Sequence, residues 1–156
     1  MRKSTLLFLV KKENESIVEI CLAMKKRGFG KGRYNGVGGK VESGETVEQA
    51  LKREAKEEIG IDVMEMSPCA VLSFTFPNNP DWDQEVHVYL STLWEGEPTE
   101  SEEMSPSWFS VESIPYDVMW PDDIYWLPHV LKGNNVRGKF SFGEGDIILS
   151  NEVEVM

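Results

Sequence analysis

The sequence predicts an α+β fold in which a mixed β-sheet is flanked by helices. Three observations support this class: segments rich in apolar and β-branched residues outnumber helical ones, two amphipathic helical patterns interrupt them, and turn residues separate the segments. The 156 residues match the usual length of one domain, so we expect a single domain over residues 1–156.

The first predicted elements are two strands of a β-hairpin, over residues 5–10 and 17–24, with a polar turn at residues 13–16. A glycine-rich stretch then occupies residues 25–40. Later elements include two helices, each followed by a glycine that favours a helix C-terminus. The helices are expected over residues 46–59 and 123–131, and further strands over residues 69–76, 85–94 and 107–111, with edge strands at 139–142 and 146–150.

The net charge of the chain is −11, which disfavours nucleic acid polymers because their phosphate backbones are repelled. A phosphorylated small molecule would need a cation between it and the protein, and a divalent metal ion is the obvious candidate. The apolar run Leu6–Val10 is too short for a signal sequence or a membrane span. We therefore expect a cytoplasmic monomer that binds no membrane, with Cys21 and Cys69 as free thiols.

The helix predicted over residues 46–59 carries carboxylates where its apolar stripe should continue. At ~100° per residue the stripe reaches Glu54 and Glu58, and Glu57 lies at its polar edge. Side chains three and four positions apart are neighbours on a helix, so the three carboxylates should converge. Such a cluster resists burial unless a divalent cation compensates its charge. The alternative is a solvated acidic face paired with neighbouring lysines and arginines.

The segment before this helix, residues 36–45, is rich in glycine. Glycine lets the backbone approach a ligand closely and adopt conformations that other residues avoid. Many glycine-rich turns are only turns. One that stands a few residues before a carboxylate cluster is a candidate site for a metal ion and a phosphate group.

The spacing Gly39-x5-Glu45-x7-Arg53-Glu54-Ala55-x-Glu57-Glu58-x-Gly60-Ile61 resembles the complete signature of the Nudix hydrolase family, G-x5-E-x7-R-E-U-x-E-E-x-G-U, where U is apolar. The resemblance implies the Nudix fold, an α/β/α sandwich with a catalytic loop–helix–loop. It also implies hydrolysis of a nucleoside diphosphate that is linked to another group.

Four further segments are similar to the oxidised purine nucleoside triphosphatases of the family. These segments are residues 24–30, 34–41, 102–104 and 119–123. This similarity implies hydrolysis of 8-oxo-dGTP and 2-hydroxy-dATP to nucleoside monophosphate and pyrophosphate, which sanitises the nucleotide pool. The chain departs from this group at Tyr34, where tryptophan is usual, and at Val37, where phenylalanine is usual.

The resemblance also implies the roles of individual residues. Mg²⁺, with Mn²⁺ as a possible substitute, would be held by the Gly38 carbonyl, Glu54, Glu57, Glu58 and Glu103. Arg53 and Glu45 would pair and brace the loop against the helix. The nucleotide would be bound by Thr5, Lys25, Phe29, Asn35, Val37, Gly38, Gly39, Lys40, Trp120, Asp122 and Asp123. Among these, Phe29 and Trp120 would pack against the purine, and Asn35, Asp122 and Asp123 would bond its edge.

Three alternatives stay open at this point. The sequence pattern alone favours Asp122 as a helix N-cap and Asp123 as a first-turn residue. The substrate could be another nucleoside diphosphate derivative, such as a dinucleoside polyphosphate or a nucleotide sugar, or the chain could be a nucleotide-binding module without catalysis. The general base is not assigned among Glu54, Glu57 and Glu103.

Overall fold

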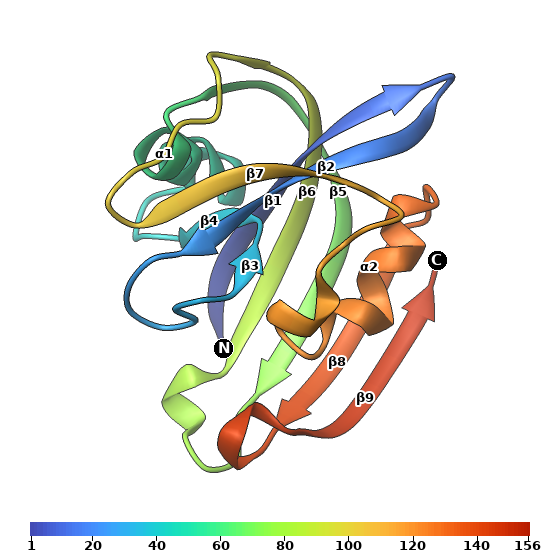
Figure 1. Cartoon of the computed structure of the whole chain (residues 1–156). Coiled ribbons are helices and arrows are strands. Elements are labelled where there is room, and N and C mark those ends of the chain that lie inside the picture. The colour runs from blue at the N-terminus through green and yellow to red at the C-terminus, as the bar shows by residue number, and fades with distance from the viewer.

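Nine β-strands and two α-helices make up the computed structural model, which describes all of residues 1–156 (Figure 1). The helices are α1 (Val47–Ile59) and α2 (Asp123–Leu131). The strands are β1 (Arg2–Glu13), β2 (Ser16–Lys25), β3 (Tyr34–Asn35), β4 (Val37–Lys40), β5 (Asp62–Thr75), β6 (Gln84–Glu95), β7 (Met104–Ser110), β8 (Val136–Phe142) and β9 (Ile148–Val155). Three short 3₁₀ helices are η1 (Pro80–Trp82), η2 (Tyr116–Val118) and η3 (Glu144–Asp146).

The strands form one mixed sheet in the order β3-β2-β1-β6-β5-β8-β9, with β4 paired to β1 and β7 paired to β2. The pairs β1–β6 and β5–β8 are parallel and the other pairs are antiparallel. The predicted hairpin is β1–β2, and the two central residues of its turn, Asn14 and Glu15, have positive φ angles. A turn of this kind matches the twist of the two strands that it joins.

The two helices lie on opposite faces of the sheet. Neighbouring residues of a strand point to opposite faces, and on β1 Leu7 belongs to the core under α1 whereas Phe8 belongs to the core under α2. Leu51 of α1 and Trp126 of α2 are fully buried in these two cores. The predicted α/β/α arrangement is therefore confirmed. Neither helix has the length and hydrophobicity that a membrane crossing requires.

Local sequence explains where α1 begins and ends. Thr46 is the N-cap: its hydroxyl accepts a hydrogen bond from the Gln49 backbone N–H, and the Gln49 side chain accepts one from the Thr46 N–H. At the other end Gly60 adopts a left-handed conformation with φ of 71°, which glycine adopts without strain. Both boundaries agree with the predicted helix over residues 46–59.

The structure adds two short strands, β3 and β4, within the glycine-rich stretch, where they pair with β2 and β1. The prediction for the tail needs correction: of its two strands, β8 lies inside the sheet, parallel to β5, and β9 lies at the edge next to it. Strand β9 also starts at Ile148, because residues 144–146 form η3.

Candidate active site

A cavity of about 920 Å³ opens on the α2 face of the sheet. Its floor is apolar, with Leu6 of β1, Leu72 and Phe74 of β5 and Val86 of β6. Most residues predicted to bind the nucleotide line this cavity, namely Thr5, Lys25, Phe29, Asn35, Gly38, Gly39, Lys40, Trp120 and Asp122, together with Glu103. Segments far apart in the sequence therefore meet around one space that is large enough for a nucleotide.

Two predicted nucleotide-binding residues do not line the cavity. Val37 is buried beneath α1 in the core that contains Leu51 and Ala55, because its side chain on β4 points toward α1 and away from the cavity. This corrects the expectation that Val37 contacts the nucleotide. Asp123 is buried at the start of α2 and is absent from the cavity wall, which Asp122 reaches.

Glu58 is the buried carboxylate of α1. Its side chain is nearly inaccessible, at 3% exposure, as the interrupted apolar stripe predicts. The Gly38 N–H donates a hydrogen bond to Glu58 Oε1 at 3.1 Å, whereas Glu58 Oε2 is buried without any hydrogen-bond partner. Burial, together with the adjacent Glu54 carboxylate, raises the pKa of Glu58 to about 8. A buried oxygen without a partner is costly unless a ligand satisfies it.

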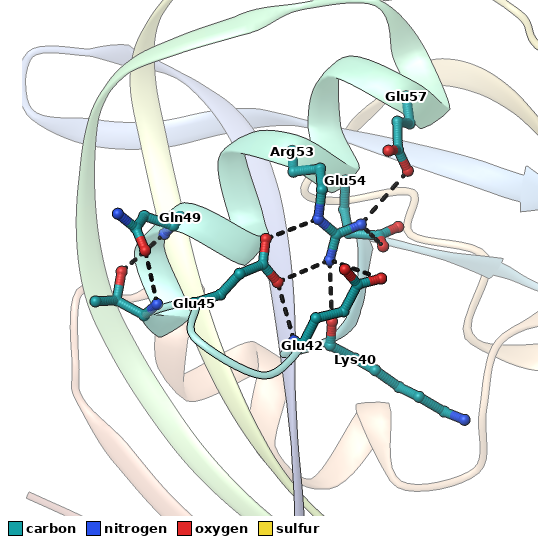
Figure 2. A network of polar contacts seen from close by, with 8 residues as sticks. Lys40, Glu42, Glu45, Gln49, Arg53, Glu54 and Glu57 are labelled. Carbon is teal, nitrogen blue, oxygen red and sulfur yellow. Dashed lines mark hydrogen bonds and ion pairs between the residues drawn. The ribbon is translucent and has the colours of Figure 1, made fainter.

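Arg53 joins the loop before α1 to the carboxylates of the helix (Figure 2). Its guanidinium donates to both oxygens of Glu45, at 2.8 and 3.0 Å, to Glu54 Oε1 at 2.6 Å and to the Lys40 carbonyl at 3.2 Å. The hydrogen bonds from Arg53 lower the pKa of Glu45 below its usual value. A two-pronged pair of this kind fixes orientation as well as charge, so the predicted Arg53–Glu45 brace is present.

The three carboxylates of α1 converge only in part. Glu54 lies close to Glu58, whereas Glu57 is mostly exposed and its carboxylate is 3.5 Å from the Arg53 guanidinium. Glu103 stands across the cavity and pairs with Lys25 at 3.8 Å and Arg27 at 3.5 Å. As the side chains stand, no three His, Cys, Asp or Glu residues form a cluster that could hold a metal ion.

At the other end of the cavity, two adjacent carboxyl groups precede and begin α2. Asp122 is the N-cap residue of α2 and Asp123 lies in its first turn, as the N-cap alternative expects. The Asp122 side chain makes no capping bond to the helix backbone, however, and its Oδ2 atom instead accepts a hydrogen bond from Trp126 Nε1 at 2.8 Å. Asp123 Oδ2 is buried without a partner. Burial raises the pKa of Asp122, and burial plus the neighbouring Asp122 charge raises the pKa of Asp123 well above its usual value.

The raised pKa of Asp123 predicts how stability depends on pH. In the folded protein the Asp123 carboxyl keeps a proton that the unfolded chain releases above about pH 4. The free energy of unfolding of the wild type should therefore fall as the pH rises from about 4 toward the raised pKa of Asp123. The variant Asp123→Asn has no proton to lose, and we expect it to be more stable than wild type at pH 8 and similar at pH 4. Urea unfolding at the two pH values measures this. Equal pH dependence in both proteins would contradict the assignment.

Two adjacent glycines allow β4 to approach β1 and α1 closely. A Cβ atom at Gly38 would overlap the Thr5 carbonyl oxygen, whereas one at Gly39 would come 2.8 Å from the Glu54 carboxyl carbon. The first contact is with backbone of the central sheet and the second is with the end of a side chain. The two positions therefore have different consequences when substituted.

We expect Gly38→Ala to destabilise the protein by about 1–3 kcal/mol or more, because β4 must move away from β1. Gly39→Ala should change stability less but reduce activity, because it displaces the Glu54 carboxylate. Urea unfolding together with steady-state turnover separates the two effects. A Gly39→Ala variant with wild-type turnover would show that the position of Glu54 is unimportant.

Comparison with known proteins decides the family. A Nudix domain profile matches residues 1–130. The oxidized purine nucleoside triphosphate hydrolase of Mus musculus is 47% identical over 131 residues, which cover 84% of this chain and 83% of the mouse protein. The chain belongs to the Nudix family. The protein of the same name from Danio rerio is 42% identical over 135 residues, 86% of each chain.

Solved structures agree with the Nudix fold. A crystal structure of the mutator MutT protein from Bacillus halodurans superposes with a TM-score of 0.83 and covers 99% of this chain and 98% of its own, at 23% identity. A Nudix hydrolase of the MutT type from Burkholderia pseudomallei superposes with a TM-score of 0.64 over 73% of this chain and 86% of its own, at 27% identity. The first match supports the arrangement of the whole Nudix chain, including β8 and β9.

Nudix hydrolases generally depend on a divalent metal ion, and the residues of this Nudix chain fit one. The fit rests on Glu58, whose Oε2 atom is buried without a partner beside Glu54 and the Gly38 backbone. Carboxylate and carbonyl oxygens are the ligands that hard divalent cations prefer. A cation there would also remove the cost of the two adjacent carboxylates.

The cavity of this Nudix protein includes residues that the sequence analysis missed. Ser4 donates a hydrogen bond from its hydroxyl to Gln84 Oε1 at 2.8 Å, and both residues line the wall, as do Arg2 and Trp82. Successive side chains of β1 point to alternate faces of the sheet, so the sequence could have placed Ser4 on the same face as Leu6 and Phe8. No local pattern indicates Trp82, because its place depends on how the loop between β5 and β6 folds.

Proposed function

We propose that this protein hydrolyses oxidised purine nucleoside triphosphates, such as 8-oxo-dGTP and 2-hydroxy-dATP, to the nucleoside monophosphate and pyrophosphate. The chain would act as one Nudix domain on the free nucleotides of the cytoplasm. One observation carries the proposal: relatives named oxidized purine nucleoside triphosphate hydrolase align over more than four fifths of both chains. That alignment reaches beyond the shared Nudix signature and includes the segments that line the base end of the cavity.

The acidic end of the site supports a role for Mg²⁺, with Mn²⁺ as a substitute. Glu54, Glu57, Glu58, the Gly38 carbonyl and Glu103 would hold the metal, which supplies Lewis acidity and neutralises the phosphate charge when it is bound. Without a cation a triphosphate would be repelled by this acidic protein. The side chains of Glu57 and Glu103 are exposed to solvent and pair with arginine and lysine side chains in the structure. Because neither side chain is part of a core, both can rotate toward a metal ion.

The chain's own residues support hydrolysis in three ways. The Arg53–Glu45 pair fixes the loop between β4, which carries Gly38 and Gly39, and α1. Lys25 and Lys40, which line the cavity, place positive charge where the phosphate chain would lie. One of Glu54, Glu57 and Glu103 would accept the proton from the attacking water as the bond between phosphorus and its bridging oxygen breaks.

The opposite end of the cavity supports recognition of the base. Asp122 accepts a hydrogen bond, and burial raises the pKa of Asp123 beside it well above its usual value. When Asp123 is protonated, the pair has both donor and acceptor character. Asn35 adds an amide on the same wall, although its Oδ1 atom accepts a bond from the Gly36 N–H. A set that contains both hydrogen-bond donors and acceptors can bind purines whose own donors and acceptors differ, as they do in 8-oxo-guanine and 2-hydroxy-adenine.

A substrate panel tests the proposal. We expect kcat/KM for 8-oxo-dGTP and 2-hydroxy-dATP to exceed that for dGTP by at least about tenfold, since one well-made hydrogen bond separates the substrates by ~1.4 kcal/mol. ADP-ribose and diadenosine polyphosphate in the same panel represent other Nudix substrates, and higher kcat/KM for either would overturn the proposal. Failure to consume any of these substrates in the presence of Mg²⁺ would indicate a binding module.

A further inference from the structure

Trp82 belongs to an aromatic cluster at the mouth of the cavity. Its ring lies 5.4 Å from the ring of Phe29 and 5.6 Å from the ring of Phe76, measured between centroids. Phe29 in turn lies 5.0 Å from Trp120. Residues Trp82 and Phe29 are 42% and 55% exposed, so they form a rim and are not part of the closed core.

Hydrogen bonds hold the loop that carries Trp82 in place. The Trp82 N–H donates to the Asn79 carbonyl at 3.0 Å, and the Asn79 N–H donates to the Phe76 carbonyl at 2.8 Å. The Phe76 N–H donates to Asp83 Oδ1 at 2.7 Å, which joins the two ends of the loop. The backbone of Trp82 is therefore held in place although its side chain is exposed.

Phe29 stands on a different kind of segment. Its neighbours Gly28 and Gly30 both have positive φ angles, which define the loop but offer no side chain to pack against Phe29. The orientation of the Phe29 ring then depends on the aromatic rings around it. Trp120 has a second support of its own, because Arg33 lies over its ring at 4.1 Å and pairs with Asp146 at 3.1 Å.

Trp82 also lies between two spaces. Besides the large cavity it lines a smaller one of about 490 Å³, which is bounded by the η1 loop and by residues 142–146 around η3. Phe76 and Phe142 line both spaces as well. Trp82 is the exposed member of this shared wall, so we expect its truncation to open the wall between the two spaces.

We propose that Trp82 is a positioning residue for the base: it holds the Phe29 ring toward Trp120 and closes the cavity at the side where the smaller space begins. This inference rests on the proposed function, because it takes a purine as the ligand of the Phe29–Trp120 wall. An aromatic pair contributes binding energy that depends on ring geometry, so a ring at position 82 matters more than its exact identity.

Isothermal titration with 8-oxo-dGMP in metal-free buffer tests this without turnover. We expect Trp82→Ala to weaken binding by about 3- to 10-fold and Trp82→Phe to stay within about twofold of wild type. Phe29→Ala should weaken binding by about tenfold or more, the effect of removing a stacked ring. If Trp82 acts through Phe29, the double variant should bind no more weakly than Phe29→Ala alone. With Mg²⁺ and 8-oxo-dGTP, Trp82→Ala should raise KM and leave kcat unchanged.

Trp94→Ala is the matched control, because Trp94 stacks on Trp108 at 5.9 Å and lines neither space. Thermal unfolding of each variant checks that the fold is kept. Wild-type affinity in Trp82→Ala, or effects of the two single variants that multiply in the double variant, would overturn the positioning role. Trp120→Ala separates this failure from that of the proposed function: if Trp120→Ala also binds like wild type, the base is not bound at this wall at all.

Discussion

Replacing Glu58 with glutamine is expected to reduce kcat/KM for 8-oxo-dGTP by about 10²- to 10⁴-fold, since a metal ion stabilises the transition state by several kcal/mol and each 1.36 kcal/mol is a factor of ten. Glu54→Gln should have a similar effect because Glu54 is the neighbouring oxygen donor. Both losses arise from the carboxylate charge, since glutamine keeps the size of the side chain.

The fold should survive this change. Glu58 is buried, and burial together with Glu54 raises its pKa to about 8 and so favours an uncharged side chain when no metal ion is bound. Glutamine supplies an uncharged side chain of the same size. We therefore expect the metal-free melting temperature of Glu58→Gln to match or exceed that of wild type, and the rise that Mg²⁺ produces in wild type to disappear. Glu48→Gln, an exposed position on the same helix, is the control. Near-normal turnover in both Glu58→Gln and Glu54→Gln would refute the metal assignment.

The second large effect concerns the preference for the nucleobase of the substrate. Asp122→Ala should lower kcat/KM for 8-oxo-dGTP by about 10- to 100-fold, the range for losing a hydrogen bond to a charged or strongly polar group. Asp123→Ala should lower it in the same direction by acting through Asp122, its neighbour on the cavity wall. The value for dGTP should fall less, so the ratio between the two substrates should drop. Competition kinetics with both nucleotides present measures this ratio directly.

Two further variants sharpen that experiment. Asp117→Asn removes an exposed carboxylate from the neighbouring 3₁₀ helix and should leave the ratio unchanged. Asp123→Asn keeps a neutral group that can donate, and it should retain more selectivity than Asp123→Ala if the buried carboxyl is protonated. An unchanged ratio in both alanine variants would mean that the pair does not recognise the base.

The helices were predictable because their signals are local. Thr46, Gln49 and Gly60 specify the ends of α1 within a few residues, and the observed bounds of α2 coincide with the predicted residues 123–131. The burial of Glu58 also follows from helical periodicity alone.

The arrangement of the strands was less predictable, since pairing joins distant segments. Strands β3 and β4 exist because β2 and β1 offer them hydrogen-bonding edges. Nothing within residues 136–142 indicates that β8 lies parallel to β5. For the same reason periodicity could not identify Trp82 or Gln84, which reach the cavity through the fold of one loop and the register of one strand pair.

The placement of α1 and α2 on opposite faces has an evolutionary consequence. The α1 carboxylates that we propose as metal ligands belong to one layer, and the Asp122–Asp123 pair belongs to the other. Each layer has its own core. Substitutions within residues 116–131 can change the nucleobase preference while the α1 carboxylates stay unchanged. In a chimera, this segment would be replaced by the same segment of a relative that prefers another nucleobase. We expect the chimera to take the nucleobase preference of that relative and to keep the kcat of this protein.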